Sequence, residues 1–318
     1  MTRYIIRRVL MMAPLLLGVS LIVFFLIHSA PGDPTAFFVP ESEPDPQVRA
    51  AVAHDLGLDQ PLPMQYVLWL RKAVTLDFGQ SFRYQQPVMG LIMERIPATF
   101  QLQGLAILLA LCLAVPVGLI SALRSGSLVD RTATVTTLFG LSMPEFWSAL
   151  MLLMIFSLAL GWLPSTGMGQ DKPFPERMLH YVLPVTVLAL TYVAWYTRFV
   201  KTSMLEVVRQ EYMTTARAKG LASQTVVIRH GLKNALIPLI TIVGLSLPRL
   251  LGGSIIIESI FAWPGIGRLG LEAVLKRDYP VIMGLAIVTT VVILVLSLVI
   301  DIIYVMVDPR ISFDSVRE

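Results

Sequence analysis

The chain has 318 residues, of which 55% are hydrophobic and only 14% are charged, and its formal net charge is +4. This composition, with a mean hydropathy of +0.73, excludes an ordinary water-soluble domain and indicates a polytopic membrane protein. We therefore expect contact with membrane lipid and no nucleic-acid partner. The one cysteine, Cys112, allows no intrachain disulfide, and the four histidines form no pattern typical of metal ligands.

Six segments reach the roughly 20 apolar residues that a helix needs to cross a bilayer. They are residues 9–30, 99–123, 133–160, 179–200, 236–257 and 281–307. The first resembles a cleaved signal peptide in having arginines before it, but its apolar stretch exceeds the roughly 7 to 15 residues of a signal-peptide hydrophobic region, so we expect a retained span. The sequence therefore predicts an all-α membrane protein with six transmembrane helices.

The positive charges predict how the chain is oriented. If the N-terminus is cytoplasmic, the inner regions hold 14 lysines and arginines and the short outer loops hold 5. The long outer loop is left out of this comparison, because long loops translocate largely regardless of charge. The bias predicts that the N-terminus, which begins the segment of residues 1–30 with the first span, faces the cytoplasm. Residues 98–307 then form the core with the other five spans, and residues 201–235 within it form a cytoplasmic loop. Residues 308–318 form a cytoplasmic tail.

Residues 31–97 are too polar and too rich in proline to cross the membrane. Within them, Asp45 and Pro46 resemble the start of a short helix that Gly57 ends. A second stretch, residues 64–74, places apolar side chains on one face of a helix. That face comprises Val67, Leu70 and Val74. We expect a small external helical subdomain between the first two spans, with Tyr66, Trp69 and Tyr84 suited to an interface; a structural cap with no ligand contact is an equal alternative.

A long basic segment separates the fourth and fifth spans. Glu206 and Glu211 come early in it and Arg217 and Lys219 come late, which is the order of charges that stabilises a helix dipole. Gly220 then follows where a glycine in the left-handed conformation would end that helix.

A second, shorter helix is expected after this corner. Ser223 is the candidate N-cap, the helix continues to His230, and Pro238 opens the next span. The pattern alone leaves three interpretations open: a basic loop that obeys the positive-inside rule, a helix pair lying on anionic lipid, or a docking element for a soluble partner.

The same stretch resembles the cytoplasmic loop of permeases from binding-protein-dependent ABC importers, in particular the dipeptide, oligopeptide and nickel branch. The resemblance is carried by ARAKGL at residues 216–221, followed by His230, Asn234 and Pro238. The broader superfamily pattern of Glu-Ala-Ala, three residues, Gly, nine residues and Ile-x-Leu-Pro survives only as Ala216, Gly220 and Leu232. This departure favours the peptide branch over sugar or phosphate importers.

Other motifs extend the resemblance over nearly the whole chain. They are PGDP at residues 31–34, LGLDQPLPMQY at 56–66, DFGQSF at 77–82, WPGIG at 263–267, RDYP at 277–280 and DPRI at 308–311. Together they resemble the permease subunit that has the long first external loop. The implied fold is that of a type I ABC importer permease, in which this chain forms half of a path for short peptides.

The resemblance also implies partners. They are a second, homologous permease in a pseudo-twofold heterodimer, one or two cytoplasmic ATPase subunits that bind ATP and Mg²⁺, and an external substrate-binding protein. None of the 21 glycines is followed by lysine, so this chain has no Walker A loop, and we expect no enzymatic activity and no cofactor of its own. Nickel, glutathione or an oligosaccharide as the substrate stays open, as does the less favoured reading as a secondary carrier.

In such importers the cytoplasmic loop seats a short coupling helix in a groove of the ATPase. The candidate coupling residues are Glu211, Ala216, Arg217, Ala218, Lys219, Gly220, Leu221, Ser223, His230, Asn234 and Pro238. A fixed corner at Gly220 would turn motion of the ATPase into rotation of the spans.

Candidate pathway or gate residues come from the last third of the chain. Arg249 lies in the fifth segment, where a mid-bilayer charge costs roughly 2.5 to 3.5 kcal/mol on insertion scales. It is expected to contact a substrate carboxylate, a companion subunit or an acid such as Glu258, although Glu258 would lie about 13 Å further along a helix. Trp263, Pro264 and Gly265 indicate an external turn with an interfacial tryptophan, which only the resemblance places near an outer gate.

Two acids lie inside predicted spans. We expect Glu145 and Asp301 to sit between helices or near a membrane face rather than in a proton relay. Residues 142–144, Ser-Met-Pro, are expected to kink the third span next to Glu145.

Overall fold

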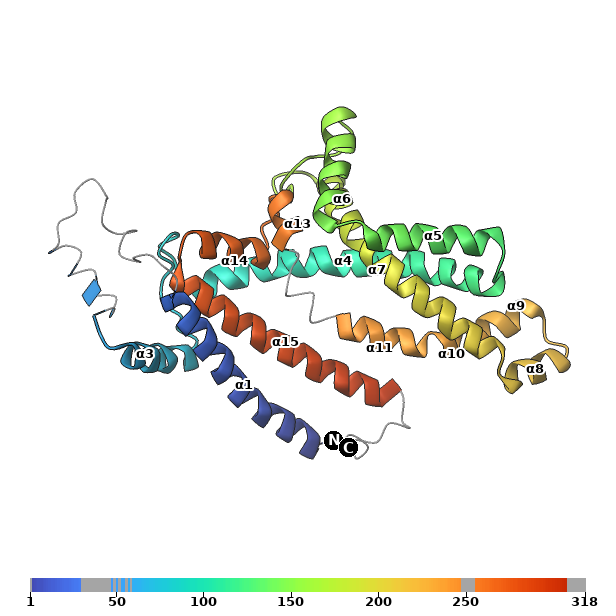
Figure 1. Ribbon diagram of the computed structural model, residues 1–318, viewed down its shortest axis with the longest axis horizontal. Coiled ribbons are helices and arrows are strands. Elements are labelled where there is room, and N and C mark those ends of the chain that lie inside the picture. The colour runs from blue at the N-terminus through green and yellow to red at the C-terminus, as the bar shows by residue number, and fades with distance from the viewer. Residues whose placement is uncertain are drawn as a thin grey trace.

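The computed structural model describes residues 2–29, 47, 50, 53–54, 57, 59–246 and 255–307, and these residues are mostly helical (Figure 1). Five helical runs within them are long and apolar enough to cross a membrane. They lie in α1 (Thr2–Ser29), α4 (Val88–Leu123), α7 (Phe174–Val208), the run Ser223–Ser246 and α15 (Tyr279–Val307). A bent pair supplies a sixth crossing if it counts as one span, which agrees with the six predicted spans.

The bent pair is the predicted third span. It consists of α5 (Leu128–Ser142) and a second arm, α6 (Glu145–Leu152) with the π-helical η2 (Leu153–Ala159), and the two arms meet at 100°. Pro144 has no N–H group to continue the helix, and a residue before proline avoids helical angles, so Met143 is extended with φ −82° and ψ 127°. The predicted kink is confirmed, and it is a complete break.

Two spans start more than ten residues earlier than the sequence predicts. α4 begins at Val88 rather than at residue 99, because Leu91 and Ile92 are buried against α14 (Ile266–Leu275) and α15. The fifth span continues from the helix that follows Gly220 and begins at Ser223 rather than at residue 236. Its predicted second half includes residues 247–254, and these lie outside the described residues.

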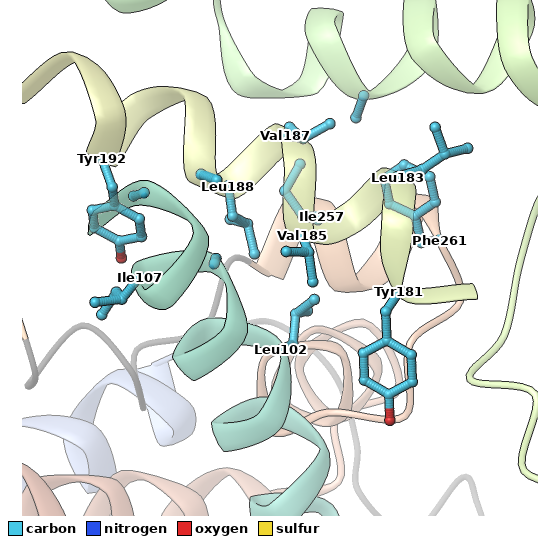
Figure 2. Close-up of a cluster of buried hydrophobic side chains, with 14 of the residues drawn as sticks. Leu102, Ile107, Tyr181, Leu183, Val185, Val187, Leu188, Tyr192, Ile257 and Phe261 are labelled. Carbon is cyan, nitrogen blue, oxygen red and sulfur yellow. The ribbon is translucent and has the colours of Figure 1, made fainter. Parts of the chain in front are cut away.

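The core of the molecule is the contact between α4 and α7. Figure 2 shows side chains of α4, α7 and α13 (Ile255–Ile260) meeting in one buried cluster. A residue without a large side chain recurs at every fourth position of α4, at Ala106, Ala110, Ala114, Gly118 and Ala122, all of them buried. A Cβ on Gly118 would lie 2.7 Å from Cβ of Val200. This small-residue stripe therefore lets the two helix backbones approach closely.

The first and last helices pack antiparallel to each other. Arg8 of α1 and Asp301 of α15 form an ion pair of 3.1 Å. The start of α1 and the end of α15 therefore lie at the same side of the molecule. The expectation that Asp301 sits between helices is confirmed.

The described part of residues 31–97 contains α3 (Leu62–Val74), which packs beside the C-terminal end of α1 (Figure 1). Its packing face is Tyr66, Trp69 and Ala73, which contact α1 and α15. The predicted apolar face is not the buried one: Val67 and Val74 are 56% and 77% exposed. The start of the first predicted external helix, at Asp45 and Pro46, lies outside the described residues. Gly57, expected to end that helix, does have a positive φ of 68°.

Two motifs that lie about 200 residues apart in sequence meet outside the spans. Asp278 of RDYP is 1% exposed, and its carboxylate accepts hydrogen bonds from the Ser81 hydroxyl and from the backbone N–H groups of Phe82 and Arg83. The Tyr84 hydroxyl donates to Glu272 of α14 at 2.6 Å. Burial, followed by this hydrogen bond, raises the pKa of Tyr84 above its usual value. The loop after α3 is therefore fastened to the junction of α14 and α15.

Candidate functional site

The basic segment forms a helical hairpin at the end of α7. α7 runs without interruption to Val208, and Arg209 and Gln210 separate it from α8 (Glu211–Ala218). Glu211 is the first residue of α8 and Arg217 lies in its last turn, as the order of charges predicts. Glu206 belongs to the last turns of α7 instead, so its expected place at the start of the same helix as Glu211 is wrong.

Gly220 makes the corner of the hairpin. Lys219 is the C-cap of α8, and Gly220 follows it with φ +73°, the left-handed conformation that the sequence predicts. A Cβ added to Gly220 would meet nothing within 4 Å. Glycine is therefore required here by its backbone conformation and not by lack of space.

The second helix of the hairpin starts one residue earlier than expected. Ala222 is its N-cap and makes no side-chain cap, whereas Ser223 is already the first helical residue, so the predicted Ser223 cap is wrong. The helix then continues through α9 (Ser223–Thr225), η3 (Val226–Leu232), α10 (Lys233–Ala235) and α11 (Ile237–Ser246). Pro238 is the second residue of α11, close to the predicted start of the span. The corner and the fifth span thus share one nearly continuous helical run.

A small apolar contact holds the two arms of the hairpin together. Met213, Ala216 and Val226 are buried against each other. A Cβ on Gly231 would lie 2.6 Å from Cε of Met204 in α7, so the second arm also packs tightly on the end of that helix. Sequence reasoning missed Met213 and Gly231. The three-residue spacing of Met213 and Ala216 on a helix is the signal that could have indicated this face.

The outer surface of the hairpin combines apolar and basic side chains. Tyr212, Leu221 and Ile228 are 40%, 41% and 53% exposed. The other exposed candidates are Glu211, Arg217, Ala218, Lys219, Gly220, Ser223, Asn234 and Pro238, while His230 is half-buried and Ala216 is buried. The Asn234 amide donates to the Tyr212 hydroxyl at 3.2 Å and to the His230 carbonyl at 2.9 Å, which ties the two arms at their base. Exposed apolar groups framed by positive charges are typical of a protein interface.

A second constellation surrounds Glu258, which is fully buried in α13. Its carboxylate accepts hydrogen bonds from the Thr99 hydroxyl of α4 at 2.8 Å and from the backbone N–H of Arg268 at 2.9 Å. The backbone N–H of Ile266 donates in turn to the Thr99 hydroxyl at 2.9 Å. The backbone N–H groups of Ile266 and Arg268 lie in the first turn of α14, so Thr99 and Glu258 satisfy N–H groups that have no partner within that helix.

The two glycines of WPGIG leave room for this carboxylate. A Cβ on Gly265 would lie 2.3 Å from the carboxyl carbon of Glu258, and one on Gly267 would lie 2.9 Å from its Oε2. Glu258 therefore closes a helical corner. A role of Glu258 in the pathway or gate stays a prediction.

Trp263 is a core residue of the same corner. It is fully buried, its indole N–H donates to the Ala98 carbonyl at 2.9 Å, and its ring packs edge-to-face on Tyr181 at 4.7 Å. The expectation of an interfacial tryptophan is wrong, because the turn folds back onto α4 and α7. Pro264 is half-buried beside it. Arg249, the remaining gate candidate, lies outside the described residues.

Charged side chains join the bent pair to α7. Lys201 of α7 forms a short ion pair with Asp130 in the first turn of α5. At the break, Glu145 accepts a hydrogen bond from the Thr191 hydroxyl of α7 at 3.3 Å, so its expected place between helices is confirmed. Sequence reasoning did not single out Lys201 or Asp130, because a pairing partner 71 residues away gives no local signal.

Two family models match most of this chain of apolar spans, basic hairpin and capped corner. The family described as "Binding-protein-dependent transport system inner membrane component" matches residues 114–313, and its N-terminal counterpart, "Binding-prot-dependent transport system membrane comp, N-term", matches residues 1–103. The chain belongs to this family of transport permeases. It is therefore a multi-pass membrane component of a transport system, as the resemblance in its motifs implies.

Relatives of this permease cover almost all of its length. The oligopeptide transport system permease protein AppB of Bacillus subtilis is 41% identical over 98% of this chain and 100% of its own. The dipeptide transport system permease protein DppB of Escherichia coli K12 is 35% identical over 98% of this chain and 99% of its own. Among solved structures, the inward-facing MetNI methionine ABC transporter has a TM-score of 0.57 at 18% identity, covering 69% of this chain and 97% of that one. The permease therefore has the fold of type I ABC importer permeases.

Proposed function

We propose that this permease forms half of the translocation path of an ATP-driven importer for short peptides. The observation that carries the proposal is the hairpin of residues 206–238, which exposes Tyr212, Leu221 and Ile228 among basic side chains. In this proposal the hairpin docks on a cytoplasmic ATPase, which binds ATP and Mg²⁺ and carries out hydrolysis. The rigid turn at Gly220 and the continuous run Ser223–Ser246 transmit motion of that partner to the fifth span.

The rest of the assembly follows from the same proposal. A homologous permease completes the path as a pseudo-twofold heterodimer, one or two ATPase subunits act from the cytoplasm, and an external binding protein delivers the substrate. Both termini then face the cytoplasm, as the distribution of lysine and arginine predicts. The names of relatives that are 35% to 41% identical over nearly the whole chain favour peptides over nickel, glutathione or oligosaccharide.

The test is an uptake assay in cells that lack the chain and are complemented with variants. Wild-type chain should restore uptake of a labelled di- or tripeptide. Leu221→Asp should lower it strongly, because a carboxylate at an exposed apolar position of the hairpin is desolvated on docking. Ser125→Asp introduces the same charge in the exposed turn between α4 and α5 and should leave uptake near the wild-type level.

The controls separate the substrate from the mechanism. Restored uptake of labelled nickel, glutathione or oligosaccharide, with no peptide uptake, would reject the peptide assignment. Peptide uptake that continues after ATP depletion and collapses with the proton gradient would favour a secondary carrier instead. Equal uptake by the Leu221→Asp and Ser125→Asp chains would reject the docking role of the hairpin.

A further inference from the structure

The imidazole ring of His28 links α1 to α3 through both of its nitrogens. His28 lies in the last turn of α1, and its Nδ1 lies 2.8 Å from the backbone carbonyl oxygen of Phe24. Its Nε2 lies 3.2 Å from Oε1 of Gln65 in α3. A carbonyl oxygen has no proton to donate, so the contact with Phe24 is a hydrogen bond only when Nδ1 carries a proton.

The orientation of the Gln65 amide follows from its second contact. A glutamine amide has an accepting oxygen at one end and a donating nitrogen at the other, and hydrogen-bond partners decide which end lies where. Nε2 of Gln65 lies 2.7 Å from the backbone carbonyl oxygen of Gln60, which can only accept. If the amide were turned around, two oxygens would lie against each other at that distance. Oε1 therefore faces His28, and Nε2 of the histidine has to donate as well.

Only the positively charged form of the ring satisfies both contacts. A neutral imidazole carries one proton, so either tautomer leaves one ring nitrogen without a proton and facing an oxygen. The imidazolium ion donates from both nitrogens. His180 shows the contrast: its Nδ1 lies 3.1 Å from the carbonyl oxygens of Thr166 and Gly167, and a neutral ring that donates from Nδ1 satisfies them.

The surroundings of His28 also favour a positive charge. The carbonyl groups at the C-terminal end of a helix carry partial negative charge, and His28 lies in the last turn of α1. The ring centroid of Phe24 lies 4.0 Å from that of His28, and the ring centroid of Tyr279 in α15 lies 5.9 Å from it. Aromatic faces attract cations.

Neighbouring charges do not replace these hydrogen bonds. The titratable and charged side chains on this side of the adjoining elements are Tyr66 and Lys72 of α3, with Asp278 and Tyr279 at the start of α15. Phenols are uncharged near neutral pH. The Asp278 carboxylate accepts from residues 81–83, and Lys72 is exposed about two turns beyond Gln65. In the described part of the chain, His28 forms no ion pair, so its hydrogen bonds set its charge.

We infer that His28 is a proton-controlled link between α1 and α3. A histidine gains and loses its second proton between about pH 5 and pH 8. At low pH on the side of the membrane where α1 ends, the imidazolium donates to Gln65 and holds the start of α3 on α1. As the pH rises, the neutral ring keeps its bond to Phe24 and loses the bond to Gln65. The hydrogen bond of 2.8 Å between the Tyr66 and Ser20 hydroxyls does not titrate in this range, so α3 stays attached there.

Nitrogen-15 NMR of the full chain in lipid bilayers tests the charge of the ring, because a ring nitrogen with a proton resonates apart from one without. The histidines are labelled, and the His28 signals are those missing from a His28→Gln chain. Gln65→Leu removes the acceptor that requires the second proton. Gln86→Leu makes the same change at an exposed position in the loop before α4 and is the matched control.

Near neutral pH, the fraction of His28 with both nitrogens protonated should be at least about twofold larger in the wild type and in Gln86→Leu than in Gln65→Leu. Equal fractions in the three chains would overturn the inference. The packing face of α3 is unchanged in Gln65→Leu, so this variant keeps its contacts with α1 and α15.

Amide hydrogen exchange of residues 59–70 tests the link itself, after correction for the effect of pH on exchange of an unfolded peptide. Between about pH 6 and pH 8, exchange should rise several-fold in the wild type and in Gln86→Leu. In Gln65→Leu it should be fast at both pH values. Exchange that stays constant while His28 loses its proton would overturn the link. An equal rise in Gln65→Leu would assign the effect to another group and would overturn it as well.

Discussion

Replacing Thr99 with valine tests the buried corner, because one hydroxyl there serves two partners. It donates to the carboxylate of Glu258 at 2.8 Å and accepts from the backbone N–H of Ile266 at 2.9 Å. Thr99→Val keeps the shape and removes both bonds, which leaves two buried polar groups short of a partner. Each such group costs about 1 to 3 kcal/mol, and a charged group costs more, so we expect a loss of about 2 to 6 kcal/mol.

The assay is thermal unfolding of the purified chain in detergent, followed by tryptophan fluorescence, to which the buried Trp263 of the same corner contributes. At about 2 to 4 °C for each kcal/mol, the melting midpoint should fall by at least about 4 °C. Thr289→Val is the matched control, because the Thr289 hydroxyl bonds only to carbonyls of its own helix. Thr99→Ser, which keeps the hydroxyl, should melt close to the wild type. Equal midpoints for the Thr99→Val and Thr289→Val chains would refute the assignment of Thr99 and Glu258 to the cap of α14.

Two further predictions concern glycines. Gly118→Leu should prevent close packing of α4 on α7 and reduce the yield of folded chain, as measured by size-exclusion chromatography, whereas Gly104→Leu should not, because a Cβ at Gly104 meets nothing within 4 Å; equal yields would contradict the close contact. Gly220→Val should cost about 1 to 2 kcal/mol in the left-handed conformation and lower substrate-stimulated ATP hydrolysis with normal membrane insertion, whereas Gly220→Asn should retain most of it. Normal hydrolysis with valine would remove the corner from the mechanism.

The local chemistry of the sequence was sufficient for several elements. Spans follow from the length of apolar runs, since a bilayer requires an unbroken helix of about 20 residues. Gly220 and Pro144 are also readable, because a positive φ and a missing N–H are properties of single residues and act wherever those residues stand. The break at Pro144 and the corner at Gly220 were accordingly predicted at the right positions.

The contacts between distant segments could not be predicted from the sequence. The sequence indicated Glu258 only as a possible pathway or gate residue or a partner of Arg249, and a lone acid beside an apolar segment gives no sign that Thr99, 159 residues earlier, will hold it. Trp263 was predicted to be interfacial, because the sequence gives no sign that its turn folds back onto α4 and α7. The face of α3 shows the limit from the other direction: the pattern of Val67, Leu70 and Val74 identified an apolar surface correctly and could not say whether protein or lipid covers it.

The sequence by itself determined which segments cross the membrane, where the chain turns sharply, and the transport family to which it belongs, because these depend on local propensity and on motifs. Only the tertiary structure decided which polar side chains are structural and which surfaces remain free. The physical reason is that the cost of a buried charge, or of an exposed apolar face, depends on the groups packed around it, and folding brings those groups from elsewhere in the chain.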